Sequence, residues 1–257
     1  MPGIFRKLIA ENRLIRVFSV GRVPHPVLVE MVGLAEGYDG IWLDQEHAGL
    51  TVEQITVANL ACRARGLGCF VRLPTTHYSL VNQALESGID GVMAARVETV
   101  ADAEQFIRWC KFAPDGLRGV NSGGADANFT FKPIGELTED ANRDQFVAIQ
   151  IETVSSLHDA EAIAALEQVD MLFVGPADLS QELGVTGQFH HEKLWKAIGQ
   201  VQVACQRHGK CWGTVSADPE FATRAVDNDC RLLTFGGDVG AIRLGLQCLK
   251  QQYREFF

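Results

Sequence analysis

Short apolar runs alternate with longer amphipathic stretches along the chain. Eight runs, bounded by Gly, Pro or Asp, have the length of buried β-strands. They are residues 15–20, 40–44, 69–73, 91–96, 146–151, 171–175, 211–216 and 231–236. Eight stretches with helical spacing of apolar positions follow them, at residues 26–36, 51–65, 78–87, 99–111, 155–167, 191–208, 218–228 and 238–250. The pattern therefore predicts a strand followed by a helix, repeated eight times.

This alternation is typical of a parallel sheet with helical crossovers, and eight units in 257 residues fit a closed barrel better than an open sheet. No GxGxxG fingerprint opens the first predicted helix, which argues against a dinucleotide-binding fold. We therefore expect residues 1–257 to form one α/β domain, a single (β/α)8 TIM barrel. Residues 113–145 are too long for an ordinary connection and predict a functional loop insertion with its own short helix.

Composition and charge narrow the possible partners and locations. The formal net charge is −9 and the Lys and Arg residues are scattered, so we expect no nucleic-acid partner. No apolar run approaches the ~20 residues that span a bilayer, and the start of the chain has no signal-like apolar block, so we expect no membrane partner. The seven cysteines form no CxxC pair, as expected of a protein with reduced thiols. These features together predict a cytoplasmic protein.

Polar residues at the carboxyl ends of the predicted strands indicate chemistry, because barrel enzymes bind their substrates there. The period of two puts Gln150 and Glu152 on one face of their strand, so both point into the barrel mouth. Asp178, Arg72 and His47 lie at or just after other strand ends. Two carboxylates with room for water and substrate oxygens suit Mg²⁺, Mn²⁺ or Co²⁺ better than Zn²⁺. The group predicts a hard-metal site for an anionic substrate.

Each of these residues also has a structural alternative. Asp178 could cap a helix, Arg72 could be the ion-pair partner of Glu152, and His47 could be a core histidine. A Schiff-base aldolase is excluded on separate grounds, because it needs a lysine at a strand's carboxyl end. The lysines fall elsewhere: Lys7, Lys111, Lys132, Lys193, Lys196, Lys210 and Lys250.

Several segments resemble one known family. They are WLDQEHAGL (42–50), VRLP (71–74), APDGLRGV (113–120), QIET (150–153) and GPADLS (175–180). These resemble motifs of the HpcH/HpaI aldolases, which are metal-dependent pyruvate aldolases. The resemblance implies an eight-stranded barrel, assembled as a homohexamer with helix exchange. It also implies cleavage or formation of a 4-hydroxy-2-oxo acid, to or from pyruvate and an aldehyde.

The resemblance also assigns roles to individual residues. Glu152 and Asp178 match the metal ligands, Gln150 matches a partner beside the metal, and Arg72 matches the arginine that contacts the pyruvate oxygen. His47 matches the general base, which an acidic residue supports, here Glu86. The backbone amides that hold the substrate carboxylate fall in the loop from Gly175 through Pro176 and Ala177 to Asp178.

Two departures from the family pattern concern the aldehyde half of the substrate. Arg96 stands where the family usually has an apolar strand with Pro, and residues 121–129 lack the basic residues often found there. Arg96 either pairs with Glu98 or Asp44, or binds a carboxylate on the aldehyde. Two other functions remain open: a citrate-lyase-β-like lyase acting on a CoA thioester, and a catalytically silent barrel that binds a 2-oxo acid.

Overall fold

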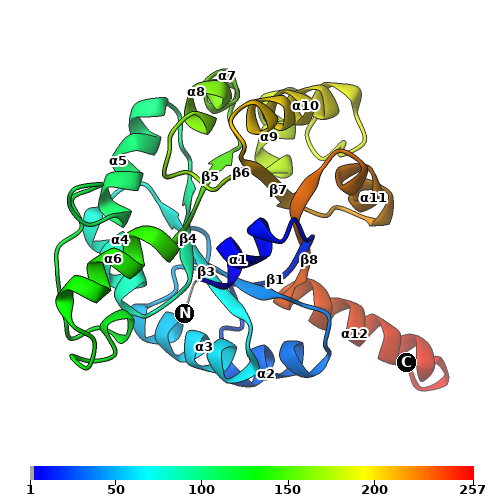
Figure 1. The fold of residues 1–257 in the computed structure, drawn as a ribbon. Helices are drawn as coiled ribbons and strands as arrows, with labels where there is room; N and C mark the ends of the chain where they lie inside the picture. Colours follow the sequence, from blue (N-terminus) through cyan, green and yellow to red (C-terminus); the bar gives the residue numbers. More distant parts are fainter. Residues whose placement is uncertain (1–2) are drawn as a thin grey trace.

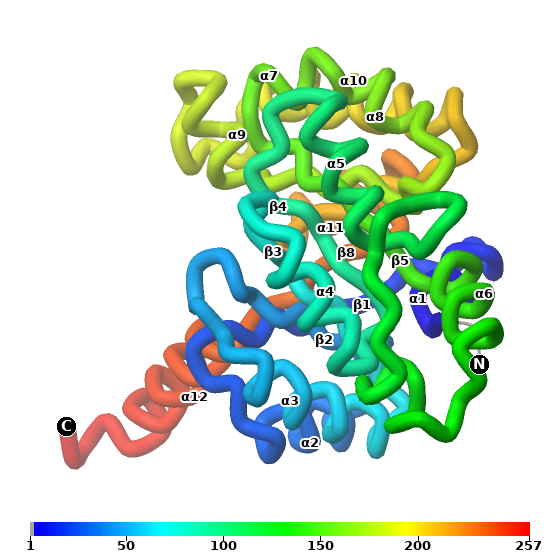
Figure 2. Tube along the Cα trace, turned by 90° about the vertical axis from the view of Figure 1, so that its left-hand side faces the viewer, coloured from blue at the N-terminus to red at the C-terminus, as the bar shows by residue number. Residues whose placement is uncertain are grey.

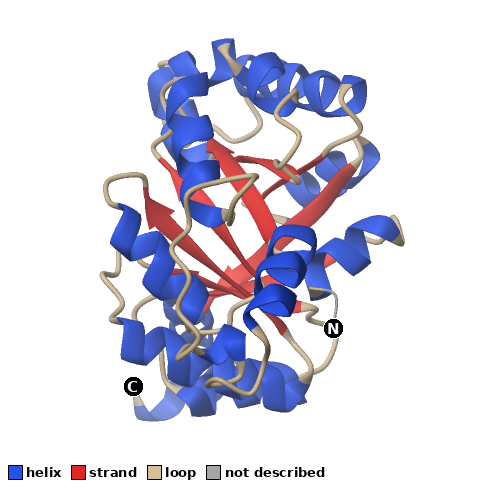
Figure 3. Ribbon diagram, turned by 60° about the vertical axis from the view of Figure 1, so that its left-hand side comes forward, coloured by secondary structure: helices blue, strands red, loops and turns tan. Residues whose placement is uncertain are grey.

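Eight parallel strands close into a barrel in the computed structural model, which describes residues 3–257. Each strand pairs with the next in sequence, and β8 pairs with β1. The strands are β1 Ile15–Val20, β2 Gly40–Asp44, β3 Gly68–Pro74, β4 Gly91–Ala95, β5 Phe146–Ile151, β6 Met171–Val174, β7 Cys211–Val215 and β8 Cys230–Gly237. Helices surround them (Figures 1 and 3). The predicted α/β class and (β/α)8 barrel are confirmed.

The helices follow the predicted order, with differences at three places. They are α1 Ile4–Ala10, α2 Pro26–Leu34, α3 Val52–Arg65, α4 Tyr78–Glu86, α5 Val100–Cys110, α6 Ile134–Asp144, α7 Val154–His158, α8 Ala160–Ala164, α9 Pro176–Glu182, α10 Glu192–Arg207, α11 Pro219–Asp227 and α12 Asp238–Gln252. The helix expected over 155–167 is two short ones, separated at Asp159, whose carboxylate accepts the N–H of Val100 at 3.1 Å. The pattern did not predict α1 or α9. The insertion at 113–145 contains a 3₁₀ turn, Ala125–Ala127, and the eleven-residue α6.

Two apolar clusters follow from the alternation of side chains along the strands. In β5, Phe146 and Ala148 belong to the cluster inside the barrel. Val147, Ile149 and Ile151 belong to the larger cluster between the sheet and the helices. This is the register that the period of two predicted, and it directs Gln150 inward at the carboxyl end of the same strand.

Helix α1 closes the barrel at the amino ends of the strands. Its Phe5 is fully buried. The centroid of the Phe5 ring lies 5.3 Å from that of Phe70 and 5.3 Å from that of Phe146. Gly40 and Gly68 make room for this ring, because a Cβ on either would lie 2.7–2.8 Å from its carbons. The same end is tied by Asp39, Asp90 and Asp170, each of which precedes a strand and accepts a backbone N–H of the neighbouring strand at 2.8–2.9 Å.

Helix α12 leaves the barrel instead of packing along it, and the chain ends beyond its far end (Figures 1 and 2). Asp238 is its one buried residue. Five exposed apolar or aromatic side chains follow one face of the helix: Val239, Ile242, Leu246, Leu249 and Tyr253 just beyond its end. Within residues 3–257, no helix is long and apolar enough to cross a membrane.

Candidate active site

Glu152 lies at the end of β5 in the barrel mouth and is 1% exposed. Its Oε1 accepts the backbone N–H of Arg96 at 2.7 Å, and its Oε2 accepts Nε2 of Gln150 at 2.5 Å. Gly175 packs directly on this pair, since a Cβ there would lie 2.7 Å from Gln150 Nε2 and 2.9 Å from Glu152 Oε2. A side chain at position 175 would therefore displace the pair.

The surroundings of Glu152 shift its proton equilibrium toward the neutral form. Burial raises the pKa of Glu152, and the negative charges of Glu46 and Asp178 raise it further. The Arg96 N–H and the more distant Arg72 charge lower this pKa without cancelling the rise. A cation at this position would relieve the cost of the charge.

Asp178 stands in the first turn of α9, and its carboxylate forms no hydrogen bond or ion pair with any residue in the range 3–257. The residue before the helix is Gly175, and no side chain caps this helix. Asp178 therefore does not cap this helix, contrary to the structural alternative. Within the same described range, the buried Gln150 Oε1 also lacks a hydrogen-bond partner.

The loop before Asp178 offers fewer backbone donors than the sequence suggested. Gly175 uses its N–H on the carbonyl of Ile151 at 3.1 Å. Pro176 has no N–H at all. Ala177 and Asp178 therefore supply the amides that remain at the start of α9.

Arg72 is held by two carboxylates at the end of β2, not by Glu152. Its Nε and Nη2 bind Asp44 at 3.0 and 2.8 Å, and its Nη1 lies 3.1 Å from Glu46 Oε2. The guanidinium also lies over Trp42, at 4.8 Å from the ring centroid. These contacts hold the side chain, which is 7% exposed, in a defined position at the end of β3.

Glu46 is a residue of this site that sequence reasoning did not select. Its carboxylate is 12% exposed, it contacts Arg72, and its charge acts on Glu152. The signal was present, because Glu46 shares the parity of Asp44 and stands one residue before His47. Its position in the mouth could not be predicted from the strand pattern, because Glu46 lies in the loop after β2 and not in the strand itself.

His47 is accessible from solvent, with 61% of its side chain exposed. Its Nε2 lies 3.8 Å from Glu46 Oε2, so the core-histidine alternative does not apply. Glu86, the predicted support of His47, lies instead on α4 in the outer helix layer. There it accepts hydrogen bonds from Asn82 at 2.9 Å and from Asn121 at 3.0 Å. One chain therefore does not bring Glu86 and His47 together.

Arg96 follows β4 directly and has a left-handed backbone, with φ of 55°. Its side chain is 57% exposed, and its Nη2 lies 3.8 Å from Glu98 Oε1. Asp44, the other acid considered for this pairing, is already occupied by Arg72. The nearest contact of the Arg96 side chain is thus a loose surface pair, while its backbone N–H binds Glu152.

The donors in the mouth fit a hard divalent cation. Of the four carboxylates there, Asp44 and Glu46 are paired with the Arg72 guanidinium, while Glu152 and Asp178 have no cationic side chain as a partner among residues 3–257. No group of three or more His, Cys, Asp or Glu residues within the described range 3–257 forms a complete metal cage. A cation here would take Glu152 and Asp178 as protein ligands and complete its shell with water or substrate oxygens, which suits Mg²⁺ or Mn²⁺.

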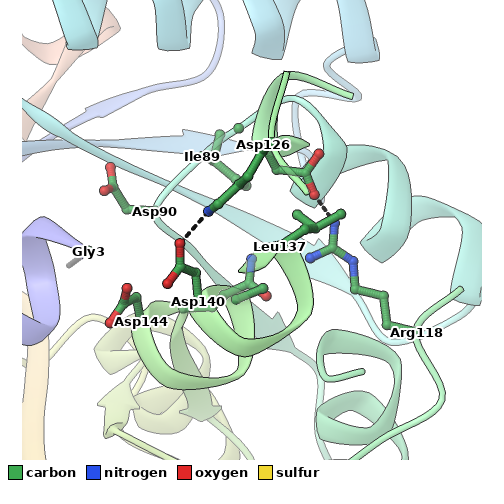
Figure 4. A pocket seen from close by; sticks show the side chains of 12 residues that line it. Gly3, Ile89, Asp90, Arg118, Asp126, Leu137, Asp140 and Asp144 are labelled. Carbon is green, nitrogen blue, oxygen red and sulfur yellow. Dashed lines mark hydrogen bonds and ion pairs between the residues drawn. The ribbon is translucent and has the colours of Figure 1, made fainter. Parts of the chain in front are cut away.

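A polar cavity of about 160 Å³ (Figure 4) lies near the amino ends of the strands, where Gly3 and Asp90 line it. It lies between α6, which carries Asp140 and Asp144, and the segment with Arg118 and Asp126. Two ion pairs of 2.5 Å cross its walls, Arg118 with Asp126 and Lys132 with Asp140. Its charged groups are largely paired, and it has no connection with the strand ends that carry Glu152.

Comparison with known proteins agrees with this geometry. Residues 18–243 match the HpcH/HpaI aldolase/citrate lyase family. The chain is 33% identical over 206 residues to the 4-hydroxy-4-methyl-2-oxoglutarate aldolase tasA of Hapsidospora irregularis, covering 79% of this chain and 76% of that one. It is 28% identical over 254 residues to the 5-keto-4-deoxy-D-glucarate aldolase of Klebsiella pneumoniae, covering 99% and 98%.

A solved structure shows the same agreement in three dimensions. An HpcH/HpaI aldolase/citrate lyase family protein of Burkholderia cenocepacia superposes with a TM-score of 0.89 at 29% identity, covering 97% of this chain and 98% of that one. The match thus covers nearly the full length of both chains. The chain belongs to the HpcH/HpaI aldolase/citrate lyase family and is a carbon–carbon lyase of the aldolase type.

Proposed function

We propose that the protein is a divalent-metal-dependent aldolase that cleaves a 4-hydroxy-2-oxo acid to pyruvate and an aldehyde, or forms it from them. One observation carries this proposal: the buried Glu152, bound by Gln150, shares the barrel mouth with the unpaired Asp178 carboxylate and the fixed Arg72 guanidinium. That set offers two anionic ligands for a cation and one cationic donor for the substrate.

The metal-binding role falls to Glu152 and Asp178, with Mg²⁺, Mn²⁺ or Co²⁺ as the ion. When bound, the cation supplies Lewis-acid polarisation of the 2-oxo group. Gln150 orients Glu152 through their 2.5 Å hydrogen bond. The N–H of Arg96 holds the other oxygen of the same carboxylate, so both oxygens are fixed before substrate arrives.

Arg72 stabilises the charge that develops on the oxygen of the pyruvate half. A guanidinium has five N–H donors, of which Asp44 takes two, and Glu46 adds an ion-pair contact at Nη1, so donors remain for substrate. The substrate carboxylate takes the backbone amides that remain at the start of α9, those of Ala177 and Asp178, because Gly175 uses its own N–H and Pro176 has none. His47 removes the proton from the C4 hydroxyl in the direction of cleavage.

We also propose a homohexamer with exchange of α12, as the family resemblance implies. The apolar stripe on α12 lies in solvent in a single chain, and a second exposed stripe runs along α2 through Val27, Met31 and Leu34. Assembly would cover such stripes. Because one chain keeps Glu86 away from His47, any support of His47 by Glu86 would have to come from a second copy.

The names of the relatives favour one class of acceptor. Glucarate and 2-oxoglutarate are both diacids, so cleavage to pyruvate leaves a second fragment that still carries a carboxylate. We propose the same class for this chain. The single-domain organisation of residues 1–257, the cytoplasmic location and the lack of nucleic-acid or membrane partners stay predictions from the sequence.

The proposal is tested by solvent deuterium exchange into the methyl group of pyruvate, followed by NMR, which needs no acceptor. We expect exchange with Mg²⁺, Mn²⁺ or Co²⁺, loss of exchange with EDTA, and no borohydride-trapped lysine adduct. Exchange that survives EDTA together with a reduced pyruvate adduct on a lysine would refute the metal mechanism. Binding of pyruvate without exchange would favour a silent barrel, and turnover of a CoA thioester alone would favour the citrate-lyase type.

A further inference from the structure

The loop between β1 and α2 is fixed by a buried carboxylate. Asp238, 6% exposed at the start of α12, accepts three consecutive backbone N–H groups on its Oδ2. They come from Gly21, Arg22 and Val23, at 3.0, 2.7 and 2.7 Å. The convergence of three donors on one oxygen immobilises the backbone of this loop at the carboxyl end of β1.

Arg22 projects from this fixed loop with its charge unpaired. Its side chain is exposed and forms no hydrogen bond or ion pair with any residue in the described part of the chain. The preceding Gly21 packs on the loop after β2, since a Cβ on it would lie 3.4 Å from that of Ala48 and 3.5 Å from that of Asp44. Ala48 follows His47, so Arg22 stands on the rim beside the His47 loop.

We propose that Arg22 binds the carboxylate of the acceptor, which makes it a specificity-determining residue of the reaction. This inference rests on the proposed function. The C1 and C2 end of the substrate lies at Glu152, Asp178 and Arg72, and the C4 hydroxyl lies at His47. Whatever extends beyond C4 leaves the mouth on the His47 side, where a free guanidinium suits a carboxylate.

Arg96 is less suited to this role. It follows β4, on the part of the rim next to Glu152, and its guanidinium has Glu98 at 3.8 Å. Arg22 has no such acidic neighbour among the contacts of the described chain, and the bound loop removes much of the entropy cost of holding it in position.

The test compares two acceptors of equal length, succinic semialdehyde and butanal, in condensation with pyruvate. The quantity measured is the ratio of kcat/KM for the acidic acceptor to kcat/KM for the neutral one. We expect Arg22→Met to lower this ratio about ten- to a hundredfold, as loss of a charge-assisted hydrogen bond does, and Arg22→Lys to recover part of it. Arg13→Met, which removes the same charge at the amino end of β1, is expected to leave the ratio unchanged.

Three outcomes overturn the inference while the aldolase itself stands. They are an unchanged ratio in a folded Arg22→Met variant, no preference for the acidic acceptor in the wild type, or a fall in the ratio with Arg96→Met and not with Arg22→Met. Thermal melting checks that each variant is folded. Failure of the proposed function looks different, because the wild type would then exchange no pyruvate methyl protons with Mg²⁺ present.

Discussion

The backbone N–H of Arg96 lies 2.7 Å from Glu152 Oε1, and Arg96 reaches that position with a left-handed backbone. The chain turns in this way directly after Ala95, the last residue of β4, and so directs a main-chain donor at the end of β5. A left-handed conformation costs a residue with a side chain roughly 1–2 kcal/mol. The turn therefore costs local backbone stability, and in return its N–H holds the Glu152 carboxylate in position.

This turn predicts opposite effects for two substitutions at position 96. Arg96→Gly keeps the N–H and relieves the strain, so we expect unchanged Mn²⁺ affinity and equal or higher stability. Arg96→Ile places a β-branched side chain in the left-handed region, so we expect a loss of about 1–2 kcal/mol of unfolding free energy and weaker Mn²⁺ binding. Urea unfolding and calorimetric Mn²⁺ titration measure both. Equal behaviour of the two variants would show that the turn does not matter.

Substitution of the proposed base, His47, and of the proposed metal ligand, Glu152, is expected to affect different quantities: turnover in the first case and metal affinity in the second. His47→Ala should lower kcat by on the order of 10²- to 10⁴-fold and leave Mn²⁺ affinity nearly intact, because His47 is exposed and is not among the groups that hydrogen-bond Glu152. Glu152→Gln should instead weaken Mn²⁺ binding, since a neutral amide replaces a carboxylate ligand. Steady-state kinetics and Mn²⁺ titration on both variants provide the check. Loss of the metal in His47→Ala would show that the assigned roles are wrong.

The barrel itself could be predicted because each strand and helix has its own hydrophobic period. The register of Gln150 and Glu152 followed from the same period, since β5 is buried on both sides and cannot slip. Helix α9 was not predicted because the segment around Pro176 was interpreted as a loop. Helix α1 was not predicted because it is buried against the open end of the barrel, and a local hydrophobic pattern carries no information about that end.

Contacts between segments that are distant along the chain could not be predicted from the sequence. The sequence suggested Glu152 as the ion-pair partner of Arg72, and only the adjacency of β2 and β3 selects Asp44 and Glu46 instead. Asp238 lies more than 200 residues from the loop that it binds, and only closure of β8 on β1 brings them together. The resemblance assigned Glu86 the role of supporting His47. In the folded chain, however, Glu86 lies in the outer helix layer and accepts hydrogen bonds from two asparagines.

Closure of the barrel by α1 predicts a large loss of stability for Phe5→Ala. Phe5 is fully buried against Phe70 and Phe146, so we expect a loss of about 3–5 kcal/mol of unfolding free energy, the range for core Phe→Ala changes. Phe131→Ala is the matched control, since Phe131 is 90% exposed, and should change the value by less than about 0.5 kcal/mol. Urea unfolding decides. Similar small losses in both variants would mean that α1 is not part of the core.

The apolar face of α12 predicts a change of assembly when a charge is introduced. Ile242→Asp lies in the centre of the exposed stripe and should shift the protein toward smaller species in sedimentation velocity, because a charge cannot be buried in an apolar contact without large cost. Gln251→Asp, on the opposite face of the same helix, should leave the assembly unchanged. A wild type that sediments as a monomer would remove the case for helix exchange.

The Asp238 carboxylate predicts a stability difference that depends on pH in a defined direction. Burial alone would raise the pKa of Asp238, but the N–H groups of Val23, Gly21, Val239 and Arg22 outweigh it and hold this pKa below the usual aspartate value. A lowered pKa in the folded state stabilises the fold above the unfolded-state pKa, near 3.9, and this contribution is lost as pH falls through the folded-state value.

Asp238→Asn removes the charge and keeps one acceptor oxygen, so we expect it to lower the unfolding free energy by about 1.5–3 kcal/mol at neutral pH. The difference from wild type should stay constant from about pH 5 to 8 and shrink below about pH 4, where the unfolded chain takes up the proton while the folded protein, with its lower pKa, does not yet do so. Asp227→Asn, at an exposed position near the end of α11, is the control and should show little difference at any pH. Urea unfolding across this pH range measures all three proteins. A difference that grows as the pH falls would mean that Asp238 is protonated in the folded state, and the β1–α2 loop would then not be held by a carboxylate charge.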